Sequence, residues 1–287
     1  MSVAPLHRIV ALRMVTRDPD RLARFYGEAL GAMPEGGPTS IGPDECQLLG
    51  VAGGSRCALR IGGFAVELDR FDDPGRPYPA DADAADLRFQ HFAAIVRDIG
   101  AVFERARACG ATLVSREGPV TLPASSGGAT AVKLCDPDGH PFELLQFPQG
   151  ADNHWRETTA NAAGVLGIDH TAISVADAAR SRCFYGAAGL TAGGATLNRG
   201  TAQDALDGLA LRAVDVVPMM PSVAAPHLEL LGYRGVAGRR VAKLDIADIA
   251  ATRTVWASDR EMLLLDPDGH RHQSGMVDAG PSSAHRA

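Results

Sequence analysis

Histidine and glutamate recur at corresponding places in similar segments of this chain, and both residue types can bind metal ions or transfer protons. Glu67, Glu143 and Glu229 are each followed directly by leucine in a short apolar run, and His91 and His170 each stand seven residues before an aspartate. Imidazole nitrogens and carboxylate oxygens together suit a borderline or hard divalent ion. The same groups can also form a buried hydrogen-bonded pair without metal, so residue type alone leaves both interpretations open.

Glu143 is informative because its surroundings are apolar. It lies in the run Pro141 to Leu145, which we expect to be a strand. Alternate side chains of a strand point to opposite faces, so Glu143 shares a face with Pro141 and Leu145 while Phe142 and Leu144 pack behind it. A carboxylate in so apolar a strand needs a partner. The sequence therefore predicts that Glu143 contacts a metal ion or an imidazole.

Two loops offer groups that could surround a ligand. Asn198, Gln203 and Asp207 lie around a glycine-containing loop and could fix a polar substrate. The same pattern is ordinary turn chemistry, with Asp207 as a cap, and that alternative stays open. The loop 123–128 contains Gly127-Gly128 but no Gly-Lys-Ser/Thr motif, so we expect a flexible hairpin or a cavity lid rather than a phosphate site.

The elements that must position these residues repeat along the chain. A strand, an aspartate that can cap a helix, and a helix ending near glycine recur from Leu12, Phe92 and Ile173, each followed by alternating apolar runs. The turn Asp-Pro-Asp-Gly-His occurs twice between expected strands, and we expect its histidines, His140 and His270, to point to solvent. These repeats predict four βαβββ modules, of which the last is shortened.

Together these motifs resemble the vicinal oxygen chelate superfamily, which includes glyoxalase I, ring-cleaving extradiol dioxygenases and bleomycin-binding proteins. The resemblance rests on Phe-Tyr and Leu-Gly or Gly-Leu in the helices, on Asp-Pro-Asp-Gly turns and on the Glu-Leu pairs, over about residues 8 to 275. It implies an α+β fold in which four tandem modules, the last degenerate, form two curved mixed-sheet half-barrel domains. We expect a paired N-terminal domain over 1–150, a linker over 151–164 and a paired C-terminal domain with a shortened last module over 165–287.

The resemblance also implies where metal ligands stand, namely in the first and last strand of each module. In the N-terminal domain these positions give Glu67, His91 and Glu143, with Ala11 at the fourth. The predicted cofactor is a divalent metal (Mn, Fe, Ni, Zn or Mg), with an open position for substrate. The corresponding positions of the C-terminal domain offer an alternative site. They are His170, Glu229 and Gln273, with Val241 at the fourth.

For function, the resemblance favours a glyoxalase-like lyase or isomerase acting on a small substrate with adjacent oxygens. In such an enzyme a metal-stabilised enolate forms, and Glu143 or Glu67 takes a proton from the neighbouring carbon. An extradiol-type dioxygenase is a second hypothesis. Of the three ligand positions that such an enzyme would use in the C-terminal domain, only the one at His170 holds a residue of the expected type. A metal-free protein that binds or sequesters a small molecule is a third.

Composition limits the partners. The net charge is −6, with 28 Lys and Arg scattered along 287 residues, which argues against nucleic acid as a partner. No apolar window approaches the roughly 20 residues that span a bilayer and no signal sequence is evident, so we expect a cytoplasmic protein without a membrane partner. Five unpaired cysteines are expected to be reduced. Modules of this kind pair within one chain or across a homodimer, and the sequence allows either.

Overall fold

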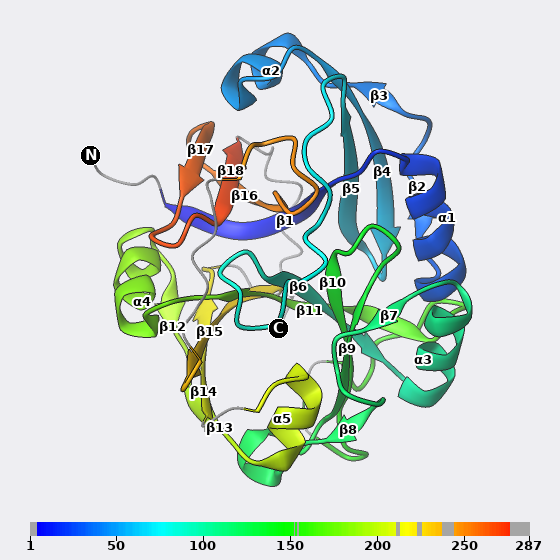
Figure 1. The fold of residues 1–287 in the computed structure, drawn as a ribbon, viewed down its shortest axis with the longest axis vertical. Helices are drawn as coiled ribbons and strands as arrows, with labels where there is room; N and C mark the ends of the chain where they lie inside the picture. Colours follow the sequence, from blue (N-terminus) through cyan, green and yellow to red (C-terminus); the bar gives the residue numbers. More distant parts are fainter. Residues whose placement is uncertain are drawn as a thin grey trace, which may run out of the picture.

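Two open mixed sheets carry most of the described chain, and each combines modules from different halves of the sequence. The computed structural model describes residues 5–151, 153, 155–210, 213–222, 226–236 and 244–275. Sheet A has eight strands, with β17-β18-β16-β1-β5-β4-β2 in order and β3 beside β4. Sheet B has ten, with β12-β14-β15-β11-β6-β10-β9-β7 in order, β13 beside β14 and β8 beside β9. Sheet A forms the upper half of Figure 1 and sheet B the lower half.

Three modules follow the expected plan of a strand, a helix and further strands. The elements of the first are β1 (Leu6–Val15), α1 (Pro19–Leu30), β2 (Met33–Pro34), β3 (Thr39–Ser40), α2 (Pro43–Leu49), β4 (Gly54–Ile61) and β5 (Phe64–Phe71). Those of the second are β6 (Gln90–Val96), α3 (Ile99–Ala108), β7 (Thr112–Leu113), β8 (Val120–Thr121), the 3-10 helix η1 (Ala124–Ser126), β9 (Thr130–Cys135) and β10 (Pro141–Gln146). Those of the third are β11 (Val165–Ser174), α4 (Ala178–Ala187), β12 (Thr191–Ala192), β13 (Thr196–Asn198), α5 (Thr201–Asp207), β14 (Ala213–Met220) and β15 (His227–Arg234).

The fourth module is reduced to three strands in the described residues: β16 (Arg253–Ser258), β17 (Met262–Leu265) and β18 (Arg271–Gly275). Its aspartate that resembles a helix cap, Asp248, lies in a turn before β16, where its carboxylate accepts hydrogen bonds from the backbone N–H groups of Arg76 and Asp245. In the other modules the first-strand residue lies seven residues before the capping aspartate. No described helix follows Asp248, so the same count from Asp248 does not lead to the first strand of module four. Val241 lies outside the described residues.

The module pairing differs from the pairing expected within each half of the chain. β1 pairs antiparallel with β16, and β6 pairs antiparallel with β11, so modules one and four build sheet A and modules two and three build sheet B. Next to the second pairing, Arg97, which directly follows β6, donates its backbone N–H to the carbonyl of Gly164, which directly precedes β11. Each sheet therefore presents first and last strands from both halves of the chain.

Helix capping agrees with the sequence. Asp18, Asp98 and Asp177 each accept a backbone N–H from the first turn of α1, α3 and α4, respectively. α1 ends at Gly31, whose φ of 67° is the left-handed conformation that glycine adopts without strain. The repeated aspartates are thus explained by helix starts.

The two Asp-Pro-Asp-Gly-His turns join the sheets to each other, and their histidines are buried rather than directed at solvent. His140 follows β9 in sheet B, and its Nε2 lies 3.0 Å from the carbonyl oxygen of Val15 in sheet A. His270 follows β17 in sheet A, and its Nε2 lies 2.9 Å from the carbonyl oxygen of Ser174 in sheet B. The expectation for these two histidines was wrong because each turn docks on a first strand of the other sheet.

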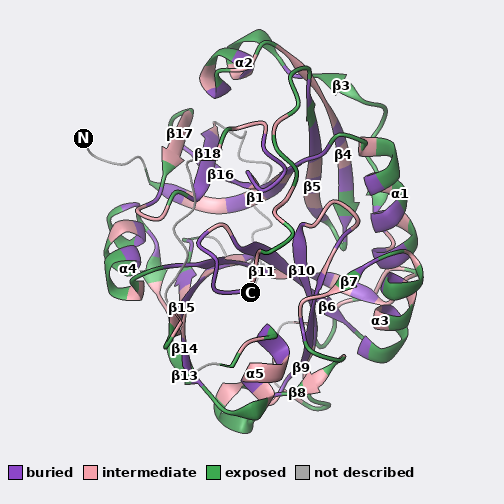
Figure 2. Ribbon diagram, in the orientation of Figure 1, coloured by how far each residue is buried: buried purple, intermediate pink, exposed green. Residues whose placement is uncertain are grey.

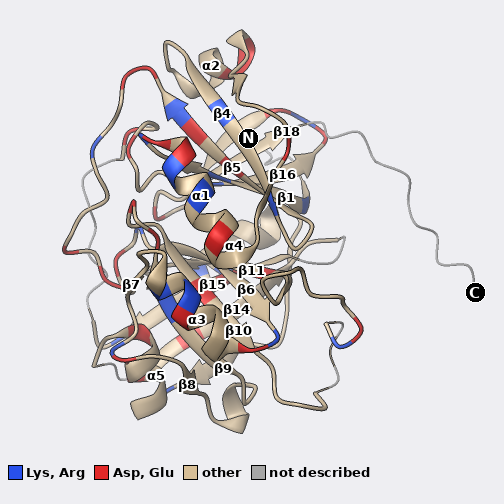
Figure 3. Ribbon diagram, turned by 90° about the vertical axis from the view of Figure 1, so that its right-hand side faces the viewer, with Lys and Arg blue, Asp and Glu red and all other residues tan. Residues whose placement is uncertain are grey.

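The apolar core is continuous between the two sheets. Tyr26 of α1 packs near Phe92 and Phe142, whose rings stack with centroids 5.9 Å apart. Figure 2 shows buried residues concentrated in the central strands, with exposed residues on the outer faces of the helices. Figure 3 shows acidic and basic residues interspersed on the face that carries α1 and α3. None of the helices in the described ranges is long and apolar enough to cross a membrane.

Candidate functional site

The centre of sheet B brings together two histidines from its first strands and two glutamates from its last strands. Glu143 pairs in register with Ala93 on β6, and Glu229 pairs with Ala172 on β11. His91 and His170 each stand two residues before those alanines, so each histidine lies on the same face of the sheet as the glutamate. β6 and β11 are adjacent antiparallel strands, and the four side chains therefore converge from both modules.

The distances show one compact cluster. Nε2 of His91 lies 3.2 Å from Oε2 of Glu143, and Nε2 of His170 lies 3.6 Å from the same oxygen. Nε2 of His170 is also 3.6 Å from Oε2 of Glu229. All four side chains are buried or nearly so, with Glu229 the most exposed at 18 %. One ligand atom each from His91, Glu143 and His170 lies within 4.8 Å of the others, which suits a common metal ion.

His170 is oriented by groups behind it. Its Nδ1 lies 3.0 Å from Oδ2 of Asp169, and Asp169 in turn accepts a hydrogen bond of 2.8 Å from the indole N–H of Trp155. When Nδ1–H donates to Asp169, the lone pair of Nε2 faces the two glutamates, and this nitrogen is buried without a hydrogen-bond partner. An unpartnered buried nitrogen between two carboxylates fits a divalent cation, which would be held by His91, Glu143 and His170, with Glu229 next to His170 as a fourth group.

Burial and charge shift the pKa values in opposite directions. Burial lowers the pKa of His91, because the protonated ring loses its hydration, and Glu143 offsets this only in part. Burial alone would raise the pKa of Glu143, but the neighbouring His170, His91 and Lys133 outweigh it and hold that pKa well below its usual range. The pKa of His170 lies well above its usual value, since Glu229 and other carboxylates outweigh the desolvation that would lower it. A cation and the His170 proton would therefore compete for one place.

A cavity opens over this cluster between modules two and three. Besides the histidines and glutamates, its lining includes Ser126 and Gly127 from the loop that carries η1, as well as Asn198 and Gln203. The glycine-rich loop thus lies at the cavity, which is consistent with the lid expected from the sequence. Asn198 ends β13, and Gln203 lies in α5, at the bottom of Figure 1. Asp207, the third predicted substrate contact, is buried and bonds to Lys133 instead of lining the cavity.

The structure regroups the two predicted ligand sets. His91 and Glu143 from the first set join His170 and Glu229 from the second, because β6 lies beside β11. Glu67 and Gln273 lie in sheet A, so the expected sets of Glu67, His91 and Glu143 and of His170, Glu229 and Gln273 are not assembled. In module four, the first-strand position is two residues before Val255, which pairs with Gln273. Arg253 occupies this position, rather than the predicted Val241.

The corresponding face of sheet A is filled by ion pairs. Glu67 is held by Arg13, whose Nε lies 2.5 Å from its Oε2, and Glu45 lies 2.6 Å from another nitrogen of Arg13. Arg253 is fully buried and bonds to Asp69. Burial lowers the pKa of Arg253 to about 10. Arginine at a ligand position and a glutamate already paired with arginine do not fit a cation, so Glu67 is not available as a catalytic base at the sheet B cluster.

Three residues near the cluster were not predicted from the sequence: Lys133, Asp169 and His227. Lys133 lies opposite Glu143 in the β9–β10 hairpin. Counting outward from the Asp-Pro-Asp-Gly turn gives this pairing, so the hairpin register was an available signal. His227 lies two residues before Glu229 on the same strand face, with Nε2 3.4 Å from Oε1 of that glutamate.

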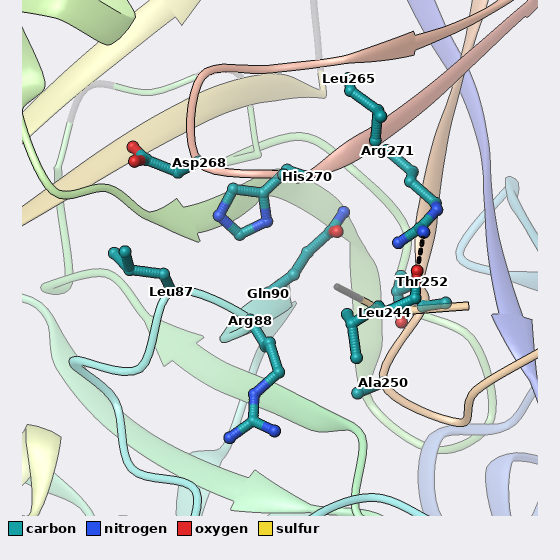
Figure 4. Close-up of a pocket in the computed structure, with 12 residues that line it drawn as sticks. Leu87, Arg88, Gln90, Leu244, Ala250, Thr252, Leu265, Asp268, His270 and Arg271 are labelled. Atoms are coloured by element: carbon teal, nitrogen blue, oxygen red, sulfur yellow. Dashed lines mark hydrogen bonds between the residues drawn. The ribbon is translucent and has the colours of Figure 1, made fainter. Parts of the chain in front are cut away.

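A separate pocket lies where the two sheets meet (Figure 4). Its lining includes Gln90, Asp268, His270 and Arg271, and Arg271 donates a hydrogen bond to the carbonyl of Leu244. The carboxylate of Asp268 already accepts a hydrogen bond from a backbone N–H group and pairs with an arginine outside the lining. None of the described metal-ligand clusters lies there. The pocket at the sheet junction is therefore distinct from the His/Glu cluster.

Comparison with known proteins agrees with this architecture. Residues 10–145 match the glyoxalase-like domain family. Glyoxalase I from Zea mays has 18% sequence identity and a TM-score of 0.57, with 93% of this chain and 91% of that chain covered. A putative dioxygenase from Bacillus subtilis has 10% identity and a TM-score of 0.54, with 95% and 86% covered. No curated protein matches the sequence significantly. The resemblance to the vicinal oxygen chelate superfamily is thus confirmed: the chain carries its glyoxalase-like domain over residues 10–145 and has its two-sheet fold.

Proposed function

We propose that this protein is a metal-dependent enzyme of the glyoxalase-like type, which moves a proton on a small substrate with two adjacent oxygens. The observation that carries the proposal is the convergence of His91, Glu143, His170 and Glu229 around the unpartnered Nε2 of His170. Two imidazoles and two carboxylates suit a divalent ion such as Mn, Fe, Ni or Zn. When bound, such an ion supplies Lewis-acid polarisation of the substrate oxygens.

In this proposal Glu143 accepts the proton that leaves the substrate carbon, and neighbouring residues hold the site in position. Glu143 lies between both imidazoles and is only 7 % exposed, so its carboxylate meets a substrate carbon with little competition from water. Asp169 holds the ring of His170 in one orientation. The apolar side chains of Leu122, Leu145 and Leu231 line the same cavity and help to exclude water. Glu67, the other predicted base, has no place in this scheme because it is paired in sheet A.

The first test is hydrogen exchange of a neutral α-hydroxyketone in deuterated water, followed by NMR, with metal-loaded and chelator-treated protein. We expect exchange at the carbon beside the two oxygens only with the metal-loaded protein. Glu143→Gln should lower the exchange rate by about 100-fold or more. The matched control is Glu67→Gln, which removes the equivalent glutamate of sheet A and should leave the rate unchanged. A metal-loaded protein without exchange on a panel of such ketones would contradict the proposal.

A ring-cleaving dioxygenase is the second candidate, and one observation favours it. His91, His170 and Glu143 form a set of two histidines and one carboxylate within 4.8 Å, which is the ligand type of non-haem iron oxygenases. Glu229 beside His170 adds a second carboxylate, which favours the proton-transfer proposal. Oxygen uptake by ferrous-loaded protein with a catechol would decide for the dioxygenase. Protein that binds small molecules equally well without metal would instead support a metal-free binding function.

A further inference from the structure

The cavity over the His/Glu cluster is poor in available positive charge. The charged side chains in its described lining, apart from the two histidines, are Lys133, Glu143, Asp169 and Glu229. A divalent cation would offset the charge of the two cluster glutamates, which leaves Lys133 as the positive and Asp169 as the negative side chain of the lining. Apart from the histidines, Lys133 is the one cationic side chain of the described lining, and its availability therefore decides whether the cavity can attract an anionic substrate.

The positive charge of Lys133 is already balanced by an ion pair with Asp207. Its Nζ lies 2.5 Å from Oδ1 of Asp207, and the two side chains are 4 % and 0 % exposed. Burial alone would lower the pKa of Lys133, but Asp207 and other neighbours outweigh it and raise that pKa, so Lys133 keeps its proton. A substrate carboxylate would have to displace a buried aspartate to reach this ammonium group, which is costly.

Beside this ion pair, two hydrogen-bond acceptors of the cavity lining have no donor. The amide nitrogen of Gln203 donates to Oδ2 of Asp207 at 2.6 Å, and this contact fixes the orientation of the amide because its oxygen would be repelled there. Oε1 of Gln203 is then buried with no partner, and so is Oδ1 of Asn198. Both residues line the cavity. Buried acceptors without donors are unfavourable, so these two oxygens call for O–H or N–H groups on a ligand.

We propose, on the basis of the function proposed above, that the substrate is uncharged and carries a hydroxyl or amide group beyond its two adjacent oxygens. That group donates to Gln203 Oε1 and Asn198 Oδ1, while the Lys133–Asp207 pair excludes carboxylates. Lys133 lies opposite Glu143 across the hairpin, so the acceptor region and the His/Glu cluster belong to one binding site. Gln203, Asn198 and Asp207 are thereby the residues that determine specificity.

The test compares three chelating probes that share one metal-binding group: catechol, its hydroxymethyl derivatives and the corresponding carboxylates, substituted at the 3- or 4-position. Their binding to cobalt-loaded protein is measured by calorimetry and by the visible spectrum of the metal. We expect the better hydroxymethyl isomer to bind about threefold to tenfold more tightly than catechol, as one added hydrogen bond allows. Both carboxylates should bind more weakly than catechol.

Variants assign the effect to named atoms. Gln203→Met should abolish the advantage of the hydroxymethyl probe while catechol still binds. Gln273→Met is the matched control, because Gln273 is a buried glutamine of sheet A whose Oε1 is also unpartnered. Asp207→Asn releases the Lys133 ammonium and should make the carboxylates bind more tightly than catechol. The double variant Lys133→Met, Asp207→Leu removes both charges and should not gain carboxylate binding, and thermal unfolding shows whether each variant is folded.

The outcomes separate the two proposals. If catechol binds no better to cobalt-loaded than to metal-free protein, the proposed function fails and this inference fails with it. If catechol needs the metal but the carboxylates bind more tightly than the hydroxymethyl probes in the unaltered protein, only the inference on substrate charge is overturned. It is also overturned if Gln203→Met and Gln273→Met affect the hydroxymethyl probe equally.

Discussion

The rings of His91 and His170 lie 5.9 Å apart, centroid to centroid, although they belong to different halves of the chain. His91 lies on β6 and His170 on β11, which are the first strands of modules two and three. These two strands are adjacent and antiparallel, and so they hold the histidines close together. We therefore expect His91→Ala and His170→Ala each to remove most of the bound metal, measured by elemental analysis after anaerobic purification. Gln273→Ala, in sheet A, should retain it. Loss in only one of the histidine variants would contradict a shared site.

Asp169 should control metal affinity without binding the metal itself. Asp169→Asn weakens the acceptor for Nδ1–H of His170 and frees the ring to take other orientations. We expect metal affinity to fall about 10- to 100-fold, as measured by competition with a chromophoric chelator. Asp215→Asn breaks an exposed pair with Arg234 and serves as the control. Equal affinities in the two variants would show that Asp169 does not orient the ring.

The ion pairs of sheet A should contribute to stability and not to metal binding. Arg253→Met leaves Asp69, which is fully buried, with Arg56 as its remaining partner. We expect the free energy of unfolding to fall by about 3 kcal/mol in urea denaturation, with the metal content unchanged. Arg60→Met breaks an exposed pair with Glu35 and should cost less than about 1 kcal/mol. Metal loss in Arg253→Met with full stability would place a second functional site on sheet A.

His272 should make the protein less stable in mild acid. The indole N–H of Trp256 donates to its Nδ1 at 3.0 Å, and Tyr185 lies 2.7 Å from Nε2, so the neutral ring is fully bonded. Burial lowers the pKa of His272 from 6.5 to about 4. Below about pH 6.5 the His272 ring takes up a proton in the unfolded chain but not in the folded protein. The free energy of unfolding therefore falls as the pH decreases from about 6.5 to 4. The loss attributable to this group approaches about 3 kcal/mol.

Urea unfolding at several pH values measures this effect. His272→Gln should be less stable at pH 8, where the buried ring is intact, and should lose less further stability on acidification than the unaltered protein. His7→Gln is the control, since His7 is exposed and its pair with Asp259 lies at the surface. An identical pH slope in the unaltered protein and His272→Gln would refute the assignment.

Much of the fold follows from features that the sequence repeats. The caps Asp18, Asp98 and Asp177, and the polar positions in first and last strands, are local patterns, and local patterns survive in any arrangement of the modules. Strand pairing between modules is different, because every first strand offers a similar unpaired edge. Nothing in the strands around Ala11 and His91 tells which partner each will take, and the two predicted ligand sets were divided wrongly for that reason.

The fourth module shows a second limit. Its aspartate, Asp248, resembles the helix caps of the other modules but lies before the first strand, so spacing alone led to Val241 instead of Arg253. His140 and His270 show a third limit. Their turns have the sequence of solvent-exposed turns, and both histidines are buried only because one sheet packs on the other.

The nested pairing of the modules bears on the order in which the chain can fold during synthesis. Strands β6 and β11 are close in sequence, whereas Ala11 on β1 waits for Val255 on β16. At 5–20 residues per second, a ribosome needs roughly 12–50 s to make the intervening chain. Sheet B, which carries the His/Glu cluster, is therefore synthesised in full while the first strand of sheet A still has a free edge, and other chains can pair with such an edge. The reduced last module covers that edge by pairing β16 with β1, and so it removes an exposed strand edge of the kind that promotes aggregation.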